Sequence, residues 1–219
     1  MPYDDLPKST RILALGDSYT IGTGVAADQS WPAQLASALR IPGVRVFEPT
    51  FIAQNGWTTG DLLAAISSSP YGGDFDLVTL LIGVNNQFQG LDLEAYRQDF
   101  DLLLKKAIEY TGGKPGRVIV LSIPDWSVTP FASGFDRPRI SMEIDEFNRV
   151  NRRLSAEAGV HYIDITPLSR QVGGDPTNLA EDGLHPSAEM YAKWVELALP
   201  VALSVVDVSK GDEIESLNR

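Results

Sequence analysis

Short apolar runs of strand length alternate with amphipathic stretches of helical length along this 219-residue chain, and this alternation limits its fold more than any other feature. The runs FDLVTLLIG and RVIVLSI are almost continuously apolar, as strands buried on both faces are. Strands that alternate with helices form a parallel sheet covered on both sides. The pattern therefore predicts a three-layer α/β/α fold around a central parallel sheet.

The alternation predicts five strands and five long helices. The strands are expected near 11–15, 44–52, 75–82, 117–123 and 160–164, and the helices near 31–40, 59–68, 92–110, 140–158 and 187–204. In 92–110 the apolar residues recur every three or four positions, which is the period of an amphipathic helix. No repeat, low-complexity segment or linker divides the chain. We therefore expect a single domain over 1–206, followed by a polar C-terminal tail over 207–219.

Composition and charge exclude several classes of function. The chain has no cysteine, which rules out disulfides, thiolate nucleophiles and Cys-ligated zinc. Its only histidines are His161 and His185, so an imidazole base has two possible positions and a His-rich metal centre is not expected. A net charge of −11 repels phosphate backbones and anionic bilayers. We therefore expect a small-molecule substrate, no nucleic-acid partner and no stable association with membranes.

The N-terminal segment MPYDDLPKSTR is acidic where a signal peptide is basic. The apolar stretch ILAL that follows is too short for a signal sequence or a membrane span. These features predict a cytoplasmic protein, whereas the oligomeric state stays open.

Polar residues that follow the predicted strands are the candidates for a functional site, because ligands of open α/β sheets bind beyond the carboxyl ends of the strands. Ser18 follows the first strand in LGDSYT, Gly56 follows the second in AQNGWTTGD, and Asn85 follows the third in IGVNN. Asp182 and His185 follow the fifth strand in EDGLHPS. We expect these segments to meet at one edge of the sheet.

These residue types fit acyl transfer. A serine hydroxyl is a poor nucleophile unless an imidazole accepts its proton, and the imidazole needs a third group that fixes its tautomer. Ser18 as nucleophile, His185 as base and Asp182 as its partner satisfy this need. The backbone N–H groups of Ser18 and Gly56 and the side-chain amide of Asn85 are candidate donors to the oxyanion of the tetrahedral intermediate.

With these motifs the chain resembles the SGNH hydrolases of the GDSL esterase and lipase family. That family has a Gly-Asp-Ser motif, a downstream Gly, a Gly-x-Asn-Asp segment and a late Asp-x-x-His, which here read GDSYT, Gly56, GVNN and DGLH in the same order. The resemblance implies a flavodoxin-like sheet of about five strands. It also implies hydrolysis of esters or thioesters through an acyl-enzyme, without metal or cofactor. Two positions depart from the pattern: Asn86 replaces the Asp, and Tyr19 replaces the Leu of the family name.

The long segment 124–139 lacks periodicity, which predicts a pocket wall or a lid rather than a plain connector. Trp57, Phe88, Trp126 and Phe131 lie in segments expected around the site. They are candidates for the lining of an acyl or aromatic pocket, and ordinary packing within the loops is the alternative.

Two functions of other classes stay open. One is ligand binding by the same fold without catalysis. The other is dinucleotide binding, because GTGVAA at 22–27 satisfies the pattern G-x-G-x-x-[GA] and Glu48 follows at a suitable distance. That match is weak, because six residues separate Leu15 from Gly22, whereas the first glycine of the fingerprint follows its strand directly. His161 is the less favoured base, because its position within a buried strand predicts packed surroundings.

Overall fold

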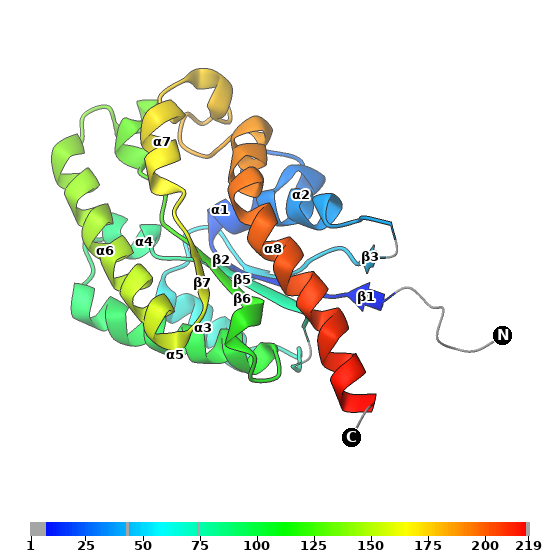
Figure 1. The fold of residues 1–219 in the computed structure, drawn as a ribbon. Coiled ribbons are helices and arrows are strands. Elements are labelled where there is room, and N and C mark those ends of the chain that lie inside the picture. The colour runs from blue at the N-terminus through cyan, green and yellow to red at the C-terminus, as the bar shows by residue number, and fades with distance from the viewer. Residues whose placement is uncertain (1–7, 43, 74, 218–219) are drawn as a thin grey trace.

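A five-stranded parallel sheet forms the middle layer of the structure, a computed structural model that describes residues 8–42, 44–73 and 75–217 (Figure 1). In spatial order the strands are β4 (Thr50–Ala53), β2 (Ile12–Gly16), β5 (Leu77–Leu81), β6 (Val118–Leu121) and β7 (His161–Ile163). Numbered along the chain, this order is 2-1-3-4-5, which is the flavodoxin-like order. The predicted α/β class and the parallel sheet of five strands are confirmed.

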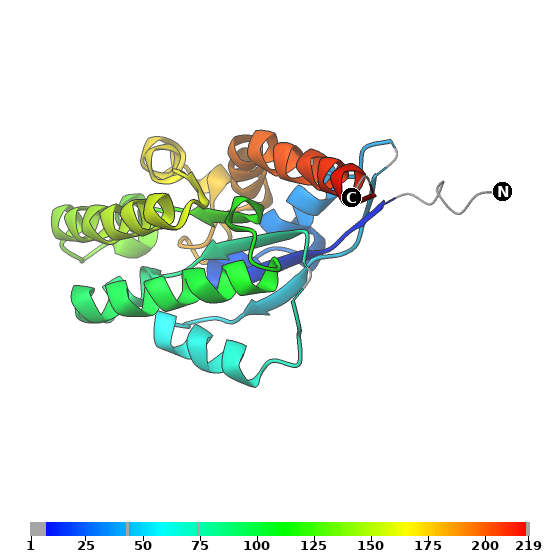
Figure 2. The same cartoon turned by 60° about the horizontal axis from the view of Figure 1, so that its bottom comes forward.

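Helices cover both faces of this sheet (Figure 2). Right-handed crossovers put the connection from β2 to β4 on one face and the later connections on the other. Helices α2 and α8 accordingly pack together on one side, and α3, α5 and α6 form the layer on the other. Their bounds are α2 (Trp31–Ala38), α3 (Thr59–Ser68), α5 (Leu93–Tyr110), α6 (Arg137–Ala158) and α8 (Ala188–Leu217). All side chains of β2, β5 and β6 are buried between these layers.

Polar caps explain where the long helices begin. Helix α3 begins at the predicted residue. Thr58 and Asp61 form a capping box there, in which each side chain accepts a hydrogen bond from the other's backbone N–H. Asp92 caps α5 by accepting from the N–H of Ala95 at 2.8 Å. Helix α6 begins at Arg137 rather than at the predicted 140, because Asp136 caps it and Pro138 occupies its first turn.

The strand predicted over 44–52 is wrong, because this segment forms two strands. Val44–Val46 is β3, which pairs with β1 (Lys8–Thr10) in a separate two-stranded sheet, and only β4 joins the central sheet. Pro49 lies between them and has no N–H to donate to a ladder. Strand β1 was not predicted.

Short helices were also missed, because fewer than two turns carry too little periodicity to detect. These are α1 (Ser18–Ile21), α4 (Val84–Phe88), α7 (Thr166–Val172) and the 3₁₀ helices Ala27–Gln29, Pro115–Arg117, Trp126–Val128, Pro130–Ala132 and Pro176–Asn178. Two of the 3₁₀ helices lie within 124–139. That segment is therefore a structured wall and not an irregular loop.

The predictions for the two ends of the chain can be compared with the structure only in part. Helix α8 continues past its predicted end to Leu217 and so includes most of the segment expected as a tail. The acidic segment 1–7, used to predict the compartment, lies outside the described residues. Among the helices that are described, none is long and apolar enough to cross a membrane.

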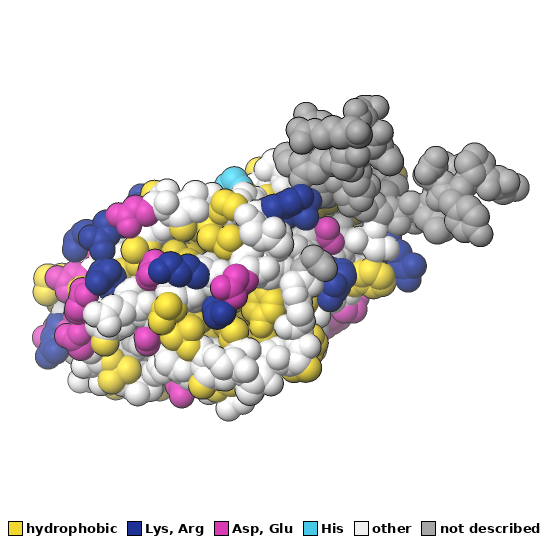
Figure 3. All heavy atoms as spheres, turned by 90° about the horizontal axis from the view of Figure 1, so that it is seen from below, with side chains coloured by type: hydrophobic (Ala, Val, Ile, Leu, Met, Phe, Trp, Pro, Cys, Tyr) yellow, Lys and Arg dark blue, Asp and Glu magenta, His cyan; other side chains and the backbone are white. Residues whose placement is uncertain are grey.

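The outer face of α5 carries paired charges. The pairs lie three or four residues apart and are Glu94–Arg97, Asp101–Lys105 and Lys106–Glu109. Figure 3, which looks onto the molecule from below, shows basic and acidic side chains mixed on this side. The negative net charge is therefore not gathered into a patch of one sign on this face.

Candidate active site

Ser18 is the first residue of α1 and follows the central strand β2 after a single turn residue. Gly16 ends the strand, and a Cβ there would lie 2.4 Å from the carbonyl oxygen of Leu81, so this position accepts only glycine. Asp17 then caps α1 by accepting from the N–H of Tyr19 at 3.0 Å. The tight strand-to-helix turn presents Ser18 at the carboxyl edge of the sheet.

Asp17 is itself a fully buried carboxyl group beside Ser18. Its Oδ1 accepts the hydrogen bond from Tyr19, whereas its Oδ2 has no hydrogen-bond partner within the described part of the chain. Burial raises the pKa of Asp17 to about 7, although the hydrogen bond from Tyr19 acts in the opposite direction. Near neutral pH this side chain is therefore close to its titration point.

Asp182 and His185 form a hydrogen-bonded pair in the turn before α8. The Nδ1 atom of His185 lies 2.5 Å from Asp182 Oδ2, and Asp182 Oδ1 accepts from the N–H groups of Leu184 and His185 at 2.9 Å. Burial raises the pKa of Asp182, but these hydrogen bonds outweigh it and hold the pKa below its usual value. Asp182 therefore stays ionised at neutral pH and fixes the orientation of the imidazole ring.

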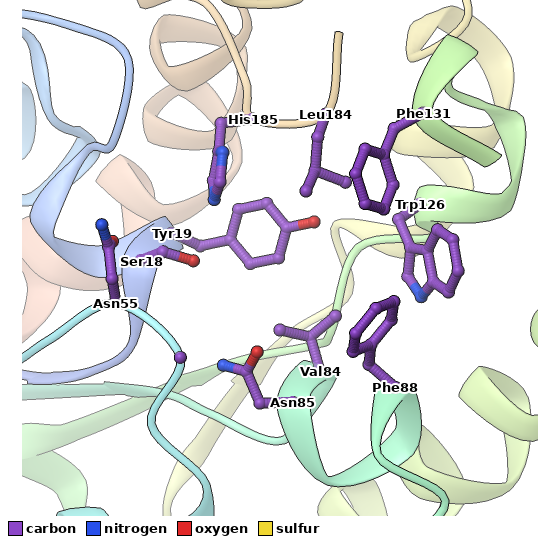
Figure 4. Close-up of a pocket in the computed structure, with 11 residues that line it drawn as sticks. Ser18, Tyr19, Asn55, Val84, Asn85, Phe88, Trp126, Phe131, Leu184 and His185 are labelled. Atoms are coloured by element: carbon purple, nitrogen blue, oxygen red, sulfur yellow. The ribbon is translucent and has the colours of Figure 1, made fainter. Parts of the chain in front are cut away.

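Ser18 and His185 line the same cavity, which has a volume of about 250 Å³ and lies at the carboxyl edge of the sheet (Figure 4). Its lining residues are Ser18, Tyr19, Asn55, Gly56, Val84, Asn85, Phe88, Trp126, Phe131, Leu184 and His185. Figure 4 shows the ring of His185 pointing toward Ser18. Among the described residues no hydrogen bond joins the two side chains, and such bonds are commonly long in ligand-free sites and tighten when substrate binds.

Gly56 and Asn85, the candidate oxyanion donors, also line the cavity. Gly56 has a φ of +78°, and a Cβ there would meet nothing within 4 Å, so its backbone conformation and not crowding requires glycine. Asn85 donates one amide hydrogen to the carbonyl oxygen of Trp57 at 2.9 Å. Because an amide group has two N–H donors, the other is available to an oxygen atom in the cavity.

Of the four aromatic candidates, Phe88, Trp126 and Phe131 line the cavity and Trp57 does not. Trp57 packs against the core, and its carbonyl oxygen accepts a hydrogen bond from the cavity residue Asn85. Phe88, Trp126 and Phe131 belong to an aromatic cluster with Phe135, in which the ring centroids lie 5.3 to 6.5 Å apart.

Three hydrogen bonds anchor the wall that carries Trp126. Trp126 Nε1 donates to Gln87 Oε1 at 2.8 Å. The neighbouring Asp125 accepts from Arg170 at 2.8 Å and from Ser141 at 2.6 Å. The indole ring is thereby held between α4, α6 and α7.

Four lining residues were missed by sequence reasoning: Tyr19, Asn55, Val84 and Leu184. Each is the sequence neighbour of a predicted site residue. Proximity to the motifs was therefore the signal that could have found them.

The alternative sites from the sequence lie elsewhere. His161 is in β7, where its Nε2 lies 3.1 Å from the carbonyl oxygen of Gly116, and it does not line the cavity. Gly22 is the C-cap of α1, so the glycine-rich segment follows a helix and not a strand. Glu48 pairs with Arg40. The strand-to-helix phosphate turn of a dinucleotide site is thus not formed there.

The family model of the GDSL-like Lipase/Acylhydrolase family matches residues 14–193, a segment that contains every residue lining the cavity. The chain belongs to this family. Membership supports ester hydrolysis as the general class of reaction. A search of curated proteins finds no match.

Solved structures share the fold of this GDSL-like chain. TesA has a TM-score of 0.69 at 23% identity, with 90% of this chain and 99% of TesA covered. Axe2, an acetylxylan esterase from Geobacillus stearothermophilus, has a TM-score of 0.68 at 18% identity, with coverage of 88% and 94%. An extracellular lipase from Streptomyces rimosus has a TM-score of 0.64 at 24% identity, with coverage of 90% and 99%. Similarity at these identities shows the fold.

Asn86 departs from the motif of this GDSL-like family, and the structure shows what it contacts. Its side chain is buried and does not line the cavity. It accepts from the N–H of Thr59 at 3.0 Å and donates to Thr59 Oγ1 at 2.8 Å. Asn86 therefore joins α4 to the first residue of α3.

Proposed function

We propose that this protein is a serine ester hydrolase in which Ser18 is the nucleophile, His185 the general base and Asp182 the residue that orients it. One observation carries the proposal. Ser18 and a His185 ring held by Asp182 line the same cavity, although they come from opposite ends of the chain.

In the proposed reaction Ser18 Oγ attacks the ester carbonyl carbon while His185 Nε2 accepts the hydroxyl proton. The N–H groups of Ser18 and Gly56 and the amide of Asn85 stabilise the oxyanion, and one such donor contributes roughly 10²- to 10³-fold in kcat. The bond to the leaving alcohol breaks as His185 returns the proton to it. Water then attacks the acyl-enzyme by the same route and restores Ser18.

The shape of the cavity supports an apolar acyl group in the substrate. Figure 4 shows Ser18 between His185 and Asn85, with Phe88, Trp126 and Phe131 beyond them. If the oxyanion faces Asn85 and the leaving oxygen faces His185, the acyl substituent extends toward the aromatic cluster. The limited cavity volume, about 250 Å³, favours an acyl chain of modest length.

The test is turnover of a series of p-nitrophenyl esters of increasing chain length, with thioesters in parallel. Because members of a triad act as a unit, Ser18→Ala and His185→Ala should each lower kcat by at least ~10³-fold with the fold intact. Matched controls are Ser133→Ala, an exposed residue near the aromatic cluster, and His161→Ala. Undiminished activity in Ser18→Ala or His185→Ala would refute the assignment. Binding of an ester without turnover by the unaltered chain would indicate the ligand-binding alternative.

A further inference from the structure

Behind the proposed oxyanion donors, three side chains form a continuous line of hydrogen bonds. Asn86 Oδ1 accepts from the N–H of Thr59 at 3.0 Å, and Asn86 Nδ2 donates to Thr59 Oγ1 at 2.8 Å. Thr59 Oγ1 in turn donates to Asp99 Oδ2 at 2.8 Å. Thr59 and Asn86 are buried, at 0% and 3% exposure, so water has little access to substitute for a lost partner.

In each of these hydrogen bonds, the chemical groups determine which atom donates and which accepts. A backbone N–H only donates, so the oxygen of the Asn86 amide must face Thr59 N and its nitrogen must face Thr59 Oγ1. The hydroxyl therefore accepts from Asn86 and donates its own proton to Asp99 Oδ2. An amide at 86 and a carboxylate at 99 are a matched pair.

The line also lies where it controls the spacing of the oxyanion donors. Thr59 is three residues after Gly56, and Asn86 is next to Asn85. Asn85 itself donates to the carbonyl oxygen of Trp57. Two adjacent residues of α4 therefore hold the 56–59 turn, and a shift of this turn would move the Gly56 N–H relative to the Asn85 amide.

We propose that Asn86 and Asp99 are positioning residues that act as one unit to hold the oxyanion donors in place, an inference that rests on the proposed function. A carboxylate at 86 would accept from Thr59 N–H and compete with Asp99 for the single proton of the Thr59 hydroxyl. One carboxylate would then lack its partner, and two like charges would face each other. When both substitutions are combined, the Thr59 hydroxyl can donate to the carboxylate at position 86 and accept from the amide at position 99. Every group then has a hydrogen-bond partner.

The experiment is a double-mutant cycle of Asn86→Asp and Asp99→Asn, with kcat, KM and Tm measured for each variant. Asn86→Asp should lower kcat about 10-fold or more with KM changed by less than about 2-fold, since small misplacements of catalytic donors cost up to ~10²-fold. Asp99→Asn should have a small effect, because the new amide oxygen still accepts from Thr59. The exchanged double variant should recover kcat and Tm to the level of Asp99→Asn. Asp101→Asn, at a half-buried position on the same helix where the side chain pairs with Lys105, is the matched control.

Full activity in Asn86→Asp, or a double variant no better than Asn86→Asp in both kcat and Tm, would overturn the proposal. Recovery of Tm without recovery of kcat would overturn the positioning role. Failure of the proposed function is recognised separately, by a Ser18→Ala variant that retains turnover. Tm can be measured whether or not the protein is active. If the effects of the two substitutions on Tm are simply additive, the proposal is overturned even when no turnover is seen.

Discussion

At the scale of single residues, Asp17 has the most unusual surroundings in the site. It is fully buried beside Ser18 with one oxygen that has no partner in the described structure, and burial raises its pKa to about 7. An acid whose pKa is higher in the folded than in the unfolded state binds a proton more readily when folded. The buried charge of Asp17 destabilises the folded state at pH 8. This cost decreases as the pH falls through 7 toward the unfolded pKa near 3.8.

We predict that Asp17→Asn reduces this pH dependence. In the unaltered protein the buried charge opposes folding at pH 8 and is relieved at pH 5.5, while the amide oxygen of the variant still caps Tyr19 at both values. Thermal unfolding at the two pH values measures the effect: the gain in Tm on acidification should be smaller in the variant. Asp28→Asn, at an exposed position, is the control. An equal gain in the Asp17 variant and the unaltered protein would show that Asp17 does not titrate in this range.

Four of the residues that line the cavity, Ser18, Gly56, Asn85 and His185, follow predicted strands. They lie together because the carboxyl ends of parallel strands share one edge of the sheet. Trp57 also follows a predicted strand but does not line the cavity. Its position in the sequence did not show that its carbonyl oxygen accepts a hydrogen bond from Asn85.

At the scale of elements, the wall opposite Ser18 depends on contacts between helices and a 3₁₀ turn. Gln87 on α4 accepts from the buried indole of Trp126 at 2.8 Å and donates to Glu143 on α6 at 2.8 Å. A single amide therefore connects three elements around the aromatic cluster.

We predict that Gln87→Met lowers the free energy of unfolding by about 1–3 kcal/mol, because the buried Trp126 N–H loses its acceptor. Denaturant unfolding measures the loss. The KM for esters with longer acyl chains should also change more than the KM for the acetyl ester, because the substitution alters the aromatic wall of the cavity and not the proposed nucleophile. Gln98→Met, on the exposed face of α5, should leave both quantities unchanged. Unchanged stability in Gln87→Met would mean that this hydrogen bond does not hold the wall.

Local chemistry marks the boundaries of some helices. The start of α3, where Thr58 and Asp61 form a capping box, agrees with the prediction, whereas α6 begins three residues before its predicted start although Asp136 caps it. The segment 44–52 was misread as one strand, because its apolar pattern continues across Pro49 while the pairing partner changes from β1 to β2. Partner choice is a long-range property that local periodicity does not contain.

At the scale of the whole molecule, the order of the strands creates the candidate site. The first strand of the flavodoxin-like order, β2, lies in the interior of the sheet, and Ser18 follows it. The turn before α8 returns over this same edge and brings the pair of Asp182 and His185 to Ser18 (Figure 1). The fold class followed from the alternation of elements. The sequence predicted that these segments meet at one edge of the sheet, and the structure adds that Ser18 and His185 line one cavity there.

Reaction with a fluorophosphonate followed by mass spectrometry of the labelled peptide tests this meeting most directly. A serine activated by a neighbouring imidazole displaces fluoride from phosphorus and keeps the phosphonyl group. We predict a single label on Ser18 in the unaltered protein, strong loss of labelling in His185→Ala, and unchanged labelling in His161→Ala. A label on a different residue, or equal labelling of Ser18 in His185→Ala, would contradict a catalytic pair of Ser18 and His185.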